Sequence, residues 1–170
     1  MGDAVSIQKV RAIVTTVSSP DKRPLYTALA FNYIDLEKSA TENIRAVAAR
    51  LKKPVEHVTV VIMDRPRHDA LIAEVRELGA RIRLITDGDV SAGVATCWES
   101  SGIDLLLGIG GAPEGVITAA AMKCMGGDFQ GRLVFRNDEE RGRAQKMGIK
   151  NFDKTYRLED LVRGSALFCA

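Results

Sequence analysis

Hydrophobic and polar residues alternate in blocks along this chain, and from residue 39 onward the blocks predict a regular series of elements. Ser39 and Glu42 have the spacing of a capping box and predict the start of a helix, whose apolar positions recur at helical spacing up to Pro54. The periodicity then predicts strands over 58–63, 81–86 and 103–107, and helices over 69–78, 90–100 and 114–125. Because short links join strand to helix to strand, the series favours a parallel sheet with right-handed crossovers.

The pattern is less regular toward the two ends. Residues 9–17 are compatible with a strand, whereas the remainder of 1–34 stays unassigned. After the third helix, the pattern predicts a strand over 131–136, a charged surface helix over 138–147 and a short helix over 158–162. An apolar strand should begin at 165–169. Domains seldom finish inside such a strand, so we expect the chain to be a fragment.

The third strand and the helix after it form the most distinctive stretch. The apolar run 103–107 is bounded by glycine, as is typical of a strand buried on both faces. Glycines within 108–111 leave the backbone open to a ligand, Pro113 suits the first helical turn, and Glu114 suits its positive dipole. Because residues 116–125 are nearly all apolar, we expect this helix to be buried. The strand-to-helix junction is therefore a candidate ligand site.

Composition narrows the class of protein. The chain has 170 residues, 46% of them hydrophobic, which is enough for one domain with a core. A net charge of +2 gives no reason to expect nucleic acid or a membrane surface as a partner. Three cysteines without close spacing indicate reduced thiols, and no signal peptide or membrane span is evident. We therefore expect a cytoplasmic protein.

Polar clusters follow each of the three predicted parallel strands, at 64–68, 87–89 and 108–114. Ligands bind at the carboxyl ends of strands in open parallel sheets, so these clusters should border one crevice. The first contains Arg65 and Arg67, which suit phosphate oxygens, with Pro66 stiffening the loop between them. Carboxylates in the other two clusters could accept sugar hydroxyls or bind a hard divalent cation. Together they predict a sugar-phosphate site with a metal.

Each cluster also has a simpler explanation. Arg65 and Arg67 could be solvated, Asp89 could cap the next helix, and Glu114 could only complement the helix dipole. His68 is predicted to be a loop or helix-start residue rather than a metal ligand, because no second histidine lies at ligand spacing. Without a ligand site, three separate simple explanations would have to hold at three neighbouring strand ends. The occurrence of polar clusters at all three ends therefore favours a site. Three other residues are expected in the core: Cys97, Trp98 and Cys124.

Common nucleotide-binding motifs are absent from the glycine-rich stretch. Pro113 stands where the dinucleotide fingerprint needs its third glycine, and Val116 and Ile117 replace the lysine and hydroxyl residue of a P-loop. Asp87 and Asp89 are similar to the start of the haloacid-dehalogenase phosphatases, although Ser91 departs from that pattern. A phosphatase with Asp87 as its nucleophile remains one alternative.

Several collinear segments resemble the class II fructose-1,6-bisphosphatases of the GlpX type, which include the cyanobacterial fructose/sedoheptulose bisphosphatases. The similarity extends from about Tyr33 to the last residue. The matching segments are 42–48, 64–68, 79–90, 108–116 and 123–133. The resemblance implies an α/β, layered sugar-phosphatase-like fold with a parallel or mixed sheet flanked by helices. It places this domain at 35–170, incomplete at both ends, after the unassigned residues 1–34.

The resemblance also implies a reaction, which is removal of the 1-phosphate of fructose 1,6-bisphosphate with Mn²⁺ or Mg²⁺. The residues that would contact the sugar phosphate are Arg65, Pro66, Arg67, Asp87, Gly88, Asp89 and Gly111. Glu114 would be a metal ligand, and sedoheptulose 1,7-bisphosphate is an alternative substrate. A homo-oligomer is expected as well.

Members of that family are about twice as long, and their first half supplies most of the acidic metal ligands. Here the first 32 residues contain only two acids, Asp3 and Asp21, and one glutamate cannot hold a two-metal site. We therefore expect the substrate half of the site in this chain, with no assignable catalytic residue. The alternative is a non-catalytic module that binds sugar phosphates or another subunit.

Overall fold

A mixed sheet forms the centre of the computed structural model, which describes residues 10–16 and 34–169. Its strands lie in the order β3-β2-β4-β1-β5-β6. Their bounds are β1 Val10–Thr16, β2 Thr59–Met63, β3 Arg81–Ile85, β4 Leu105–Gly110, β5 Gly127–Leu133 and β6 Thr155–Arg157. β2 is parallel to both of its neighbours, whereas β1 is antiparallel to β4 and β5, and β6 is antiparallel to β5.

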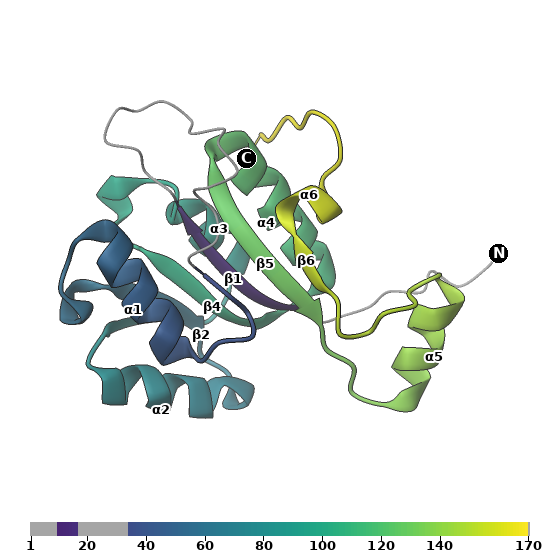
Figure 1. The fold of residues 1–170 in the computed structure, drawn as a ribbon, viewed down its shortest axis with the longest axis horizontal. Coiled ribbons are helices and arrows are strands. Elements are labelled where there is room, and N and C mark those ends of the chain that lie inside the picture. Colours follow the sequence, from purple (N-terminus) through teal and green to yellow (C-terminus); the bar gives the residue numbers. More distant parts are fainter. Residues whose placement is uncertain (1–9, 17–33, 170) are drawn as a thin grey trace.

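Helices cover the two faces of this sheet, giving three layers (Figure 1). The helices are α1 Ala40–Leu51, α2 Asp69–Leu78, α3 Asp89–Ala95, α4 Ala112–Met125, α5 Asp138–Lys146 and α6 Leu158–Leu161. One hydrophobic core joins α1 and α2 to one sheet face, and the other joins α3, α4 and α6 to the opposite face. In β4, Leu105 and Leu107 enter the first core and Leu106 enters the second, so this strand is buried on both faces.

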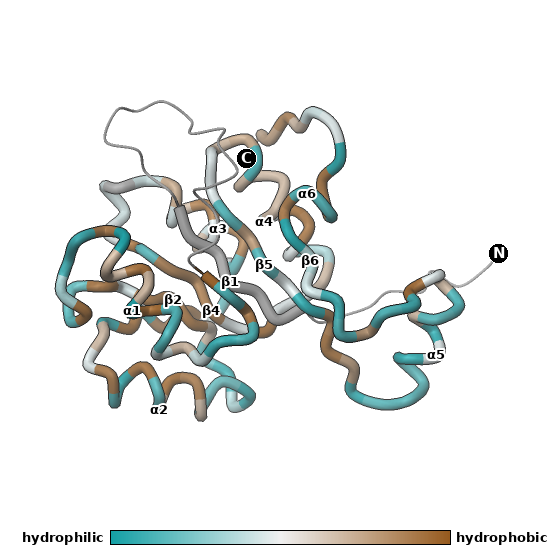
Figure 2. The backbone as a smooth tube through the Cα atoms, in the orientation of Figure 1, coloured by the Kyte–Doolittle hydropathy of each residue, from teal (hydrophilic) through white to brown (hydrophobic). Residues whose placement is uncertain are grey.

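The charged helix α5 stands apart from these layers, and most residues along it are hydrophilic (Figures 1 and 2). It begins at Asn137, whose side chain accepts a hydrogen bond from the Glu140 amide. The sequence prediction of a charged surface helix is confirmed. In the described part of the chain, no helix is long and apolar enough to span a bilayer.

Local signals set the ends of several helices. The Ser39 side chain accepts from the Glu42 amide and the Glu42 carboxylate accepts from the Ser39 amide, which confirms the capping box. Gly79, with φ of 83°, and Gly126, with φ of 77°, end α2 and α4 in the left-handed conformation that glycine adopts without strain.

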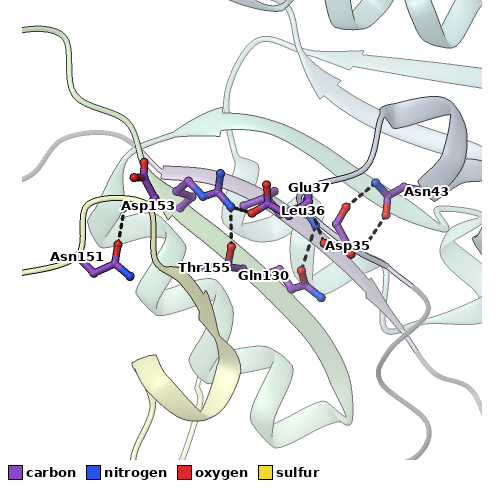
Figure 3. A network of polar contacts seen from close by, with 9 residues as sticks. Asp35, Leu36, Glu37, Asn43, Gln130, Asn151, Asp153 and Thr155 are labelled. Atoms are coloured by element: carbon purple, nitrogen blue, oxygen red, sulfur yellow. Dashed lines mark hydrogen bonds and ion pairs between the residues drawn. The ribbon is translucent and has the colours of Figure 1, made fainter.

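Buried amide side chains attach the segment before α1 to the sheet (Figure 3). Gln130 on β5 donates to the Ile34 carbonyl at 2.7 Å and accepts from the Leu36 amide at 3.2 Å. Asn43 on α1 accepts from the Asp35 amide at 2.7 Å and donates back to the Asp35 carbonyl. These two side chains supply the partners that buried backbone groups need outside regular structure.

The antiparallel half of the sheet differs from the sequence prediction. Strand β1 confirms the strand expected over 9–17, and it pairs antiparallel between β4 and β5, so the sheet is mixed, one of the two forms that the resemblance implied. β5 begins at Gly127, directly after α4, rather than at 131, because β1 supplies a partner strand for its glycine-rich start. The short strand β6 was not predicted. The helix expected over 90–100 ends at Ala95 and is followed by a 3₁₀ turn at Glu99–Ser101.

Two expectations about the region around α4 are also wrong. Residues 165–169 form no strand, because Lys123 and Cys124 on α4 bind carbonyls between Val162 and Ala166. Nor is α4 buried all round, since Val116 and Ile117 are 44% and 48% exposed on the side away from the second core.

Of the three side chains expected in the core, two lie outside it and the third is only partly buried. Trp98 is 52% exposed, Cys124 is exposed, and Cys97 is only partly buried against the second core. Helix α3 ends at Ala95, sooner than the sequence predicted, so Trp98 lies beyond the helix rather than on its inward-facing side.

Candidate functional site

The three polar clusters predicted from the sequence lie at one edge of the sheet. β2, β3 and β4 are parallel neighbours, so their carboxyl ends point the same way. The Asp64 amide continues the pairing by donating to the Ile85 carbonyl at 2.8 Å. The loops after the three strands therefore adjoin one another, as the sequence predicted.

Arg65 and Arg67 attach the loop after β2 to both neighbouring strand ends. Arg65 donates at 2.6 Å to the carbonyl of Thr86, which lies just beyond the end of β3. It also donates to the carbonyl of the preceding residue, Asp64. Arg67 donates from Nε and Nη2 to the Ile109 carbonyl of β4, at 2.9 and 2.8 Å. Nε of Arg65 and Nη1 of Arg67 take no part in these bonds. The arginines are thus fixed in orientation rather than freely solvated.

His68 lies between β2 and β4 and is fully buried. Its Nδ1 lies 2.7 Å from the Met63 carbonyl, and its Nε2 accepts from the Ile109 amide at 2.8 Å. Burial lowers the pKa of His68, and the charges of Arg67 and Arg65 act in the same direction. The sequence correctly placed His68 at a helix start, since it precedes α2, but gave no sign of this bridging role.

Asp89 and Glu114 lie over two glycines at the end of β4. A Cβ atom on Gly110 would come within 2.6 Å of Asp89 Oδ2, and one on Gly111 would collide with Glu114 Oε2. Burial raises the pKa of Asp89, and the nearby charges of Glu114 and Asp87 raise it further. The missing side chains of the two glycines therefore allow both carboxylates to approach the backbone.

The loop after β3 places its two aspartates differently. Asp87 is exposed and accepts from the Gly88 amide at 2.8 Å, whereas Asp89 is half-buried and accepts from the Val90 amide at 2.9 Å. Gly88, with φ of 83°, holds the position before α3, and Asp89 is the first residue of that helix. The prediction that Asp89 caps the helix is therefore wrong.

Cavities lie on both sides of the carboxyl end of β4. The smaller, of about 30 Å³, is lined by Asp89, Gly110, Gly111 and Glu114, among others. The larger, of about 300 Å³, lies toward α1 and α2; its lining includes Lys38, Arg67, His68, Glu74 and Ile109. The two cavities thus place Asp89 and Glu114 on one side of the strand end and Arg67 on the other.

The family model of bacterial fructose-1,6-bisphosphatase, glpX-encoded, matches residues 26–170. The chain belongs to this family. Three curated relatives are each named D-fructose 1,6-bisphosphatase class 2/sedoheptulose 1,7-bisphosphatase. The relative from Trichodesmium erythraeum (strain IMS101) is 42% identical over 169 aligned positions, covering 91% of this chain and 49% of the relative. Those from Microcystis aeruginosa (strain NIES-843 / IAM M-2473) and Synechocystis sp. (strain ATCC 27184 / PCC 6803 / Kazusa) are 46% and 44% identical, covering 83% of this chain and 44% of each relative.

The chain spans about half the length of the curated relatives that it matches. The family match begins at residue 26, a few residues before the resemblance noted at Tyr33. The segment between them lies outside the described residues. The family assignment and the α/β fold predicted from the sequence are confirmed.

Membership of the fructose-1,6-bisphosphatase family implies a divalent metal requirement. A hard divalent cation takes about six oxygen ligands. Asp89 and Glu114 supply two neighbouring carboxylates, but the described residues include no group of three or more histidine, cysteine, aspartate or glutamate side chains that could hold a metal. These residues do not by themselves make a complete metal site, and Glu114 as a ligand stays a prediction.

Proposed function

We propose that this chain forms the sugar-phosphate-binding part of an active site that hydrolyses the 1-phosphate of fructose 1,6-bisphosphate, giving fructose 6-phosphate and phosphate. The main support is that three segments meet at one edge of the sheet. They are the loop that carries Arg65 and Arg67 (the arginine loop), the Asp87–Asp89 loop and the Gly110–Glu114 junction. The names of relatives 42–46% identical to this chain agree with that reaction.

The proposed roles follow from charge and position. Arg65 and Arg67, with Pro66 between them, would bind the phosphate that is not cleaved, since each guanidinium keeps N–H groups outside its backbone bonds. Asp87, Gly88 and Asp89 would contact sugar hydroxyls, and Gly111 would let the substrate approach the backbone. Glu114 would be one ligand of the divalent cation, Mn²⁺ or Mg²⁺, beside the phosphate to be cleaved.

Phosphate release from fructose 1,6-bisphosphate in the presence of Mn²⁺ tests this proposal. We expect Glu114→Gln to abolish any release, because the amide removes the charge that a cation needs. Glu77→Gln is a matched control at an exposed position on α2, and should leave release unchanged. Equal release by the wild type and Glu114→Gln would contradict the role of Glu114.

A second candidate is a binding module without turnover. It is supported by the incomplete metal ligand set among the described residues. This module would bind fructose 1,6-bisphosphate but release no phosphate, with or without Mn²⁺. Turnover that depends on Glu114 would exclude it.

Three finer assignments are also proposed. Sedoheptulose 1,7-bisphosphate is a second substrate, in keeping with the names of the relatives. Self-association is supported by the exposed apolar side chains on α4 and can be measured by sedimentation. A cytoplasmic location is supported by three unpaired cysteines.

A further inference from the structure

Strand pairing between β2 and β4 covers only part of their length. Their register is Val60 with Leu105 and Val61 with Leu106, and β2 ends at Met63 while β4 continues to Gly110. On the other edge, β1 pairs with β4 as far as Gly110. The β2-facing edge of Ile109 therefore needs hydrogen-bond partners other than a strand.

Two consecutive side chains supply those partners. The Ile109 amide donates to His68 Nε2 at 2.8 Å, and the Ile109 carbonyl accepts from Arg67 Nε and Nη2 at 2.9 and 2.8 Å. At the other side of its ring, His68 Nδ1 lies 2.7 Å from the carbonyl of Met63, the last residue of β2. The imidazole thus joins the end of β2 to the end of β4, in place of a direct backbone bond.

Only one form of the imidazole satisfies both bonds. The Met63 carbonyl needs a donor and the Ile109 amide needs an acceptor, so the ring must be neutral with its proton on Nδ1. The ring is fully buried, and a Cβ atom on Gly108 would lie 3.3 Å from Cε1 and Nε2. Packing as well as hydrogen bonding therefore holds the ring in place.

We propose that His68 is a positioning residue that fixes the Ile109 backbone, and through it the Gly110–Gly111 edge and the Arg67 guanidinium, for binding of the sugar bisphosphate. Ile109 directly precedes the glycines over which Asp89 and Glu114 lie. Its carbonyl also orients Arg67. The His68 ring thereby sets the distance between the arginine loop and the carboxylates of Asp89 and Glu114. This inference rests on the proposed function.

Charged groups around the ring would make its protonation disruptive. Arg65 and Arg67 lie on the same turn, and the adjoining cavity is lined by Lys38, just before α1, and by Glu74 on α2. A protonated ring would turn Nε2 into a donor facing the Ile109 amide, and would add a third positive charge beside the two guanidiniums. Burial keeps the pKa of His68 below its ordinary value, which favours the neutral form.

Two substitutions of His68 separate its two bonds. His68→Gln places an amide oxygen near the position of Nε2 and can still accept from Ile109, whereas His68→Asn reaches only the Met63 side. His57→Asn is the matched control, because His57 is exposed on the 3₁₀ turn Val55–His57. Each variant of the chain would be compared with the wild type by amide hydrogen exchange at Ile109 and by calorimetric titration with fructose 1,6-bisphosphate and Mn²⁺.

We expect the wild-type ring to show a proton on Nδ1 in its nitrogen NMR shifts. His68→Asn should speed exchange at Ile109 and weaken bisphosphate binding by about ten- to a hundredfold, the effect of leaving a buried donor unpaired. His68→Gln should restore most of the affinity. If His68→Asn does not fold, Gly108→Ala, which crowds the same ring, should weaken binding in the same direction.

Loss of affinity that is equal in His68→Asn and His68→Gln would overturn the proposal, because it would indicate a general packing role. Wild-type affinity in His68→Asn would overturn it as well. If the wild type binds no bisphosphate, the proposed function fails and the positioning role fails with it. A wild type that binds, beside an unaffected His68→Asn, refutes the positioning role alone.

Discussion

Two glycines determine where the carboxylates of the candidate site lie. Gly110 and Gly111 leave space over the backbone, and Asp89 and Glu114 occupy that space. The pKa of Asp89 is raised because burial disfavours its charged form and because Glu114 and Asp87 add negative potential. A cation bound beside these groups would favour their ionised forms, in agreement with the metal requirement of the family.

Substitution of Gly111 by alanine tests this arrangement. The backbone of Gly111, with φ of −72°, accepts alanine, but the new Cβ would displace the Glu114 carboxylate. We expect binding of fructose 1,6-bisphosphate with Mn²⁺ to weaken at least about tenfold, the loss of one charge-assisted contact, while the free energy of unfolding changes by no more than about 1 kcal/mol. Calorimetry and chemical denaturation measure the two quantities.

Gly142→Ala is the matched control for that variant. Gly142 lies inside α5, where a Cβ atom meets nothing within 4 Å. The substitution should raise the free energy of unfolding by about 0.5–1 kcal/mol and leave ligand binding unchanged. A Gly111→Ala variant that binds like this control would show that the Glu114 position has no importance for the ligand.

Asp128 gives a prediction about pH. It is buried, its Oδ1 accepts from the Phe129 amide, and its Oδ2 has no hydrogen-bond partner among the described residues. Burial raises the pKa of Asp128 to about 6. The folded state therefore holds a proton that the unfolded state releases near pH 4, and stability falls as pH rises from about 4 to 6.

Asp128→Asn should remove that dependence. Relative to the wild type, the variant should gain up to about 3 kcal/mol in the free energy of unfolding between pH 4 and pH 7. Denaturation at a series of pH values measures the difference between the two proteins. A constant offset across this range would contradict the raised pKa.

At the residue scale, the sequence predicted the types of side chain at the site but not their contacts. The arginines and carboxylates were found because charged residues follow apolar strands. His68 was missed because a single buried histidine leaves no periodic signal, and its partners are backbone groups of Met63 and Ile109. Asn43 and Gln130 were missed for the same reason.

At the scale of elements, local pattern was sufficient where neighbours in sequence are neighbours in space. The alternation of β2, α2, β3 and α3 follows from apolar periodicity and from glycine at helix ends. The antiparallel pairing of β1, β5 and β6 was not predicted, because it joins strands that are distant in sequence. In the same way, exposure on α4 depends on what packs against it rather than on its apolar composition.

Gln130 tests the attachment of the segment before α1. Gln130→Leu would leave the Ile34 carbonyl and the Leu36 amide without their partner in a buried setting. We expect the free energy of unfolding to fall by about 2–4 kcal/mol in chemical denaturation. Gln145→Leu, at an exposed position on α5, should change it by less than about 0.5 kcal/mol. Equal effects of the two substitutions would contradict the stabilising role of the two hydrogen bonds made by Gln130.

At the scale of the whole molecule, the candidate site occupies one edge of the parallel half of the sheet. On the side of β4 away from β2, the antiparallel strand β1 pairs with β4, and β5 follows β1. The position of Gly110 at the end of β4 therefore depends on both the parallel and the antiparallel half of the sheet. The chain spans about half the length of its curated relatives. The function that we propose for it is therefore binding of the sugar bisphosphate, with turnover only where a complete metal site is present.

Calorimetric titration of the chain with fructose 1,6-bisphosphate and Mn²⁺ tests that assignment most directly. We expect saturable binding that Arg67→Ala weakens about ten- to a hundredfold, because a charge-assisted phosphate contact is lost. Arg143→Ala, on the distant helix α5, should bind like the wild type. No binding by the wild type, or undiminished binding by Arg67→Ala, would contradict a sugar-phosphate site at this edge of the sheet.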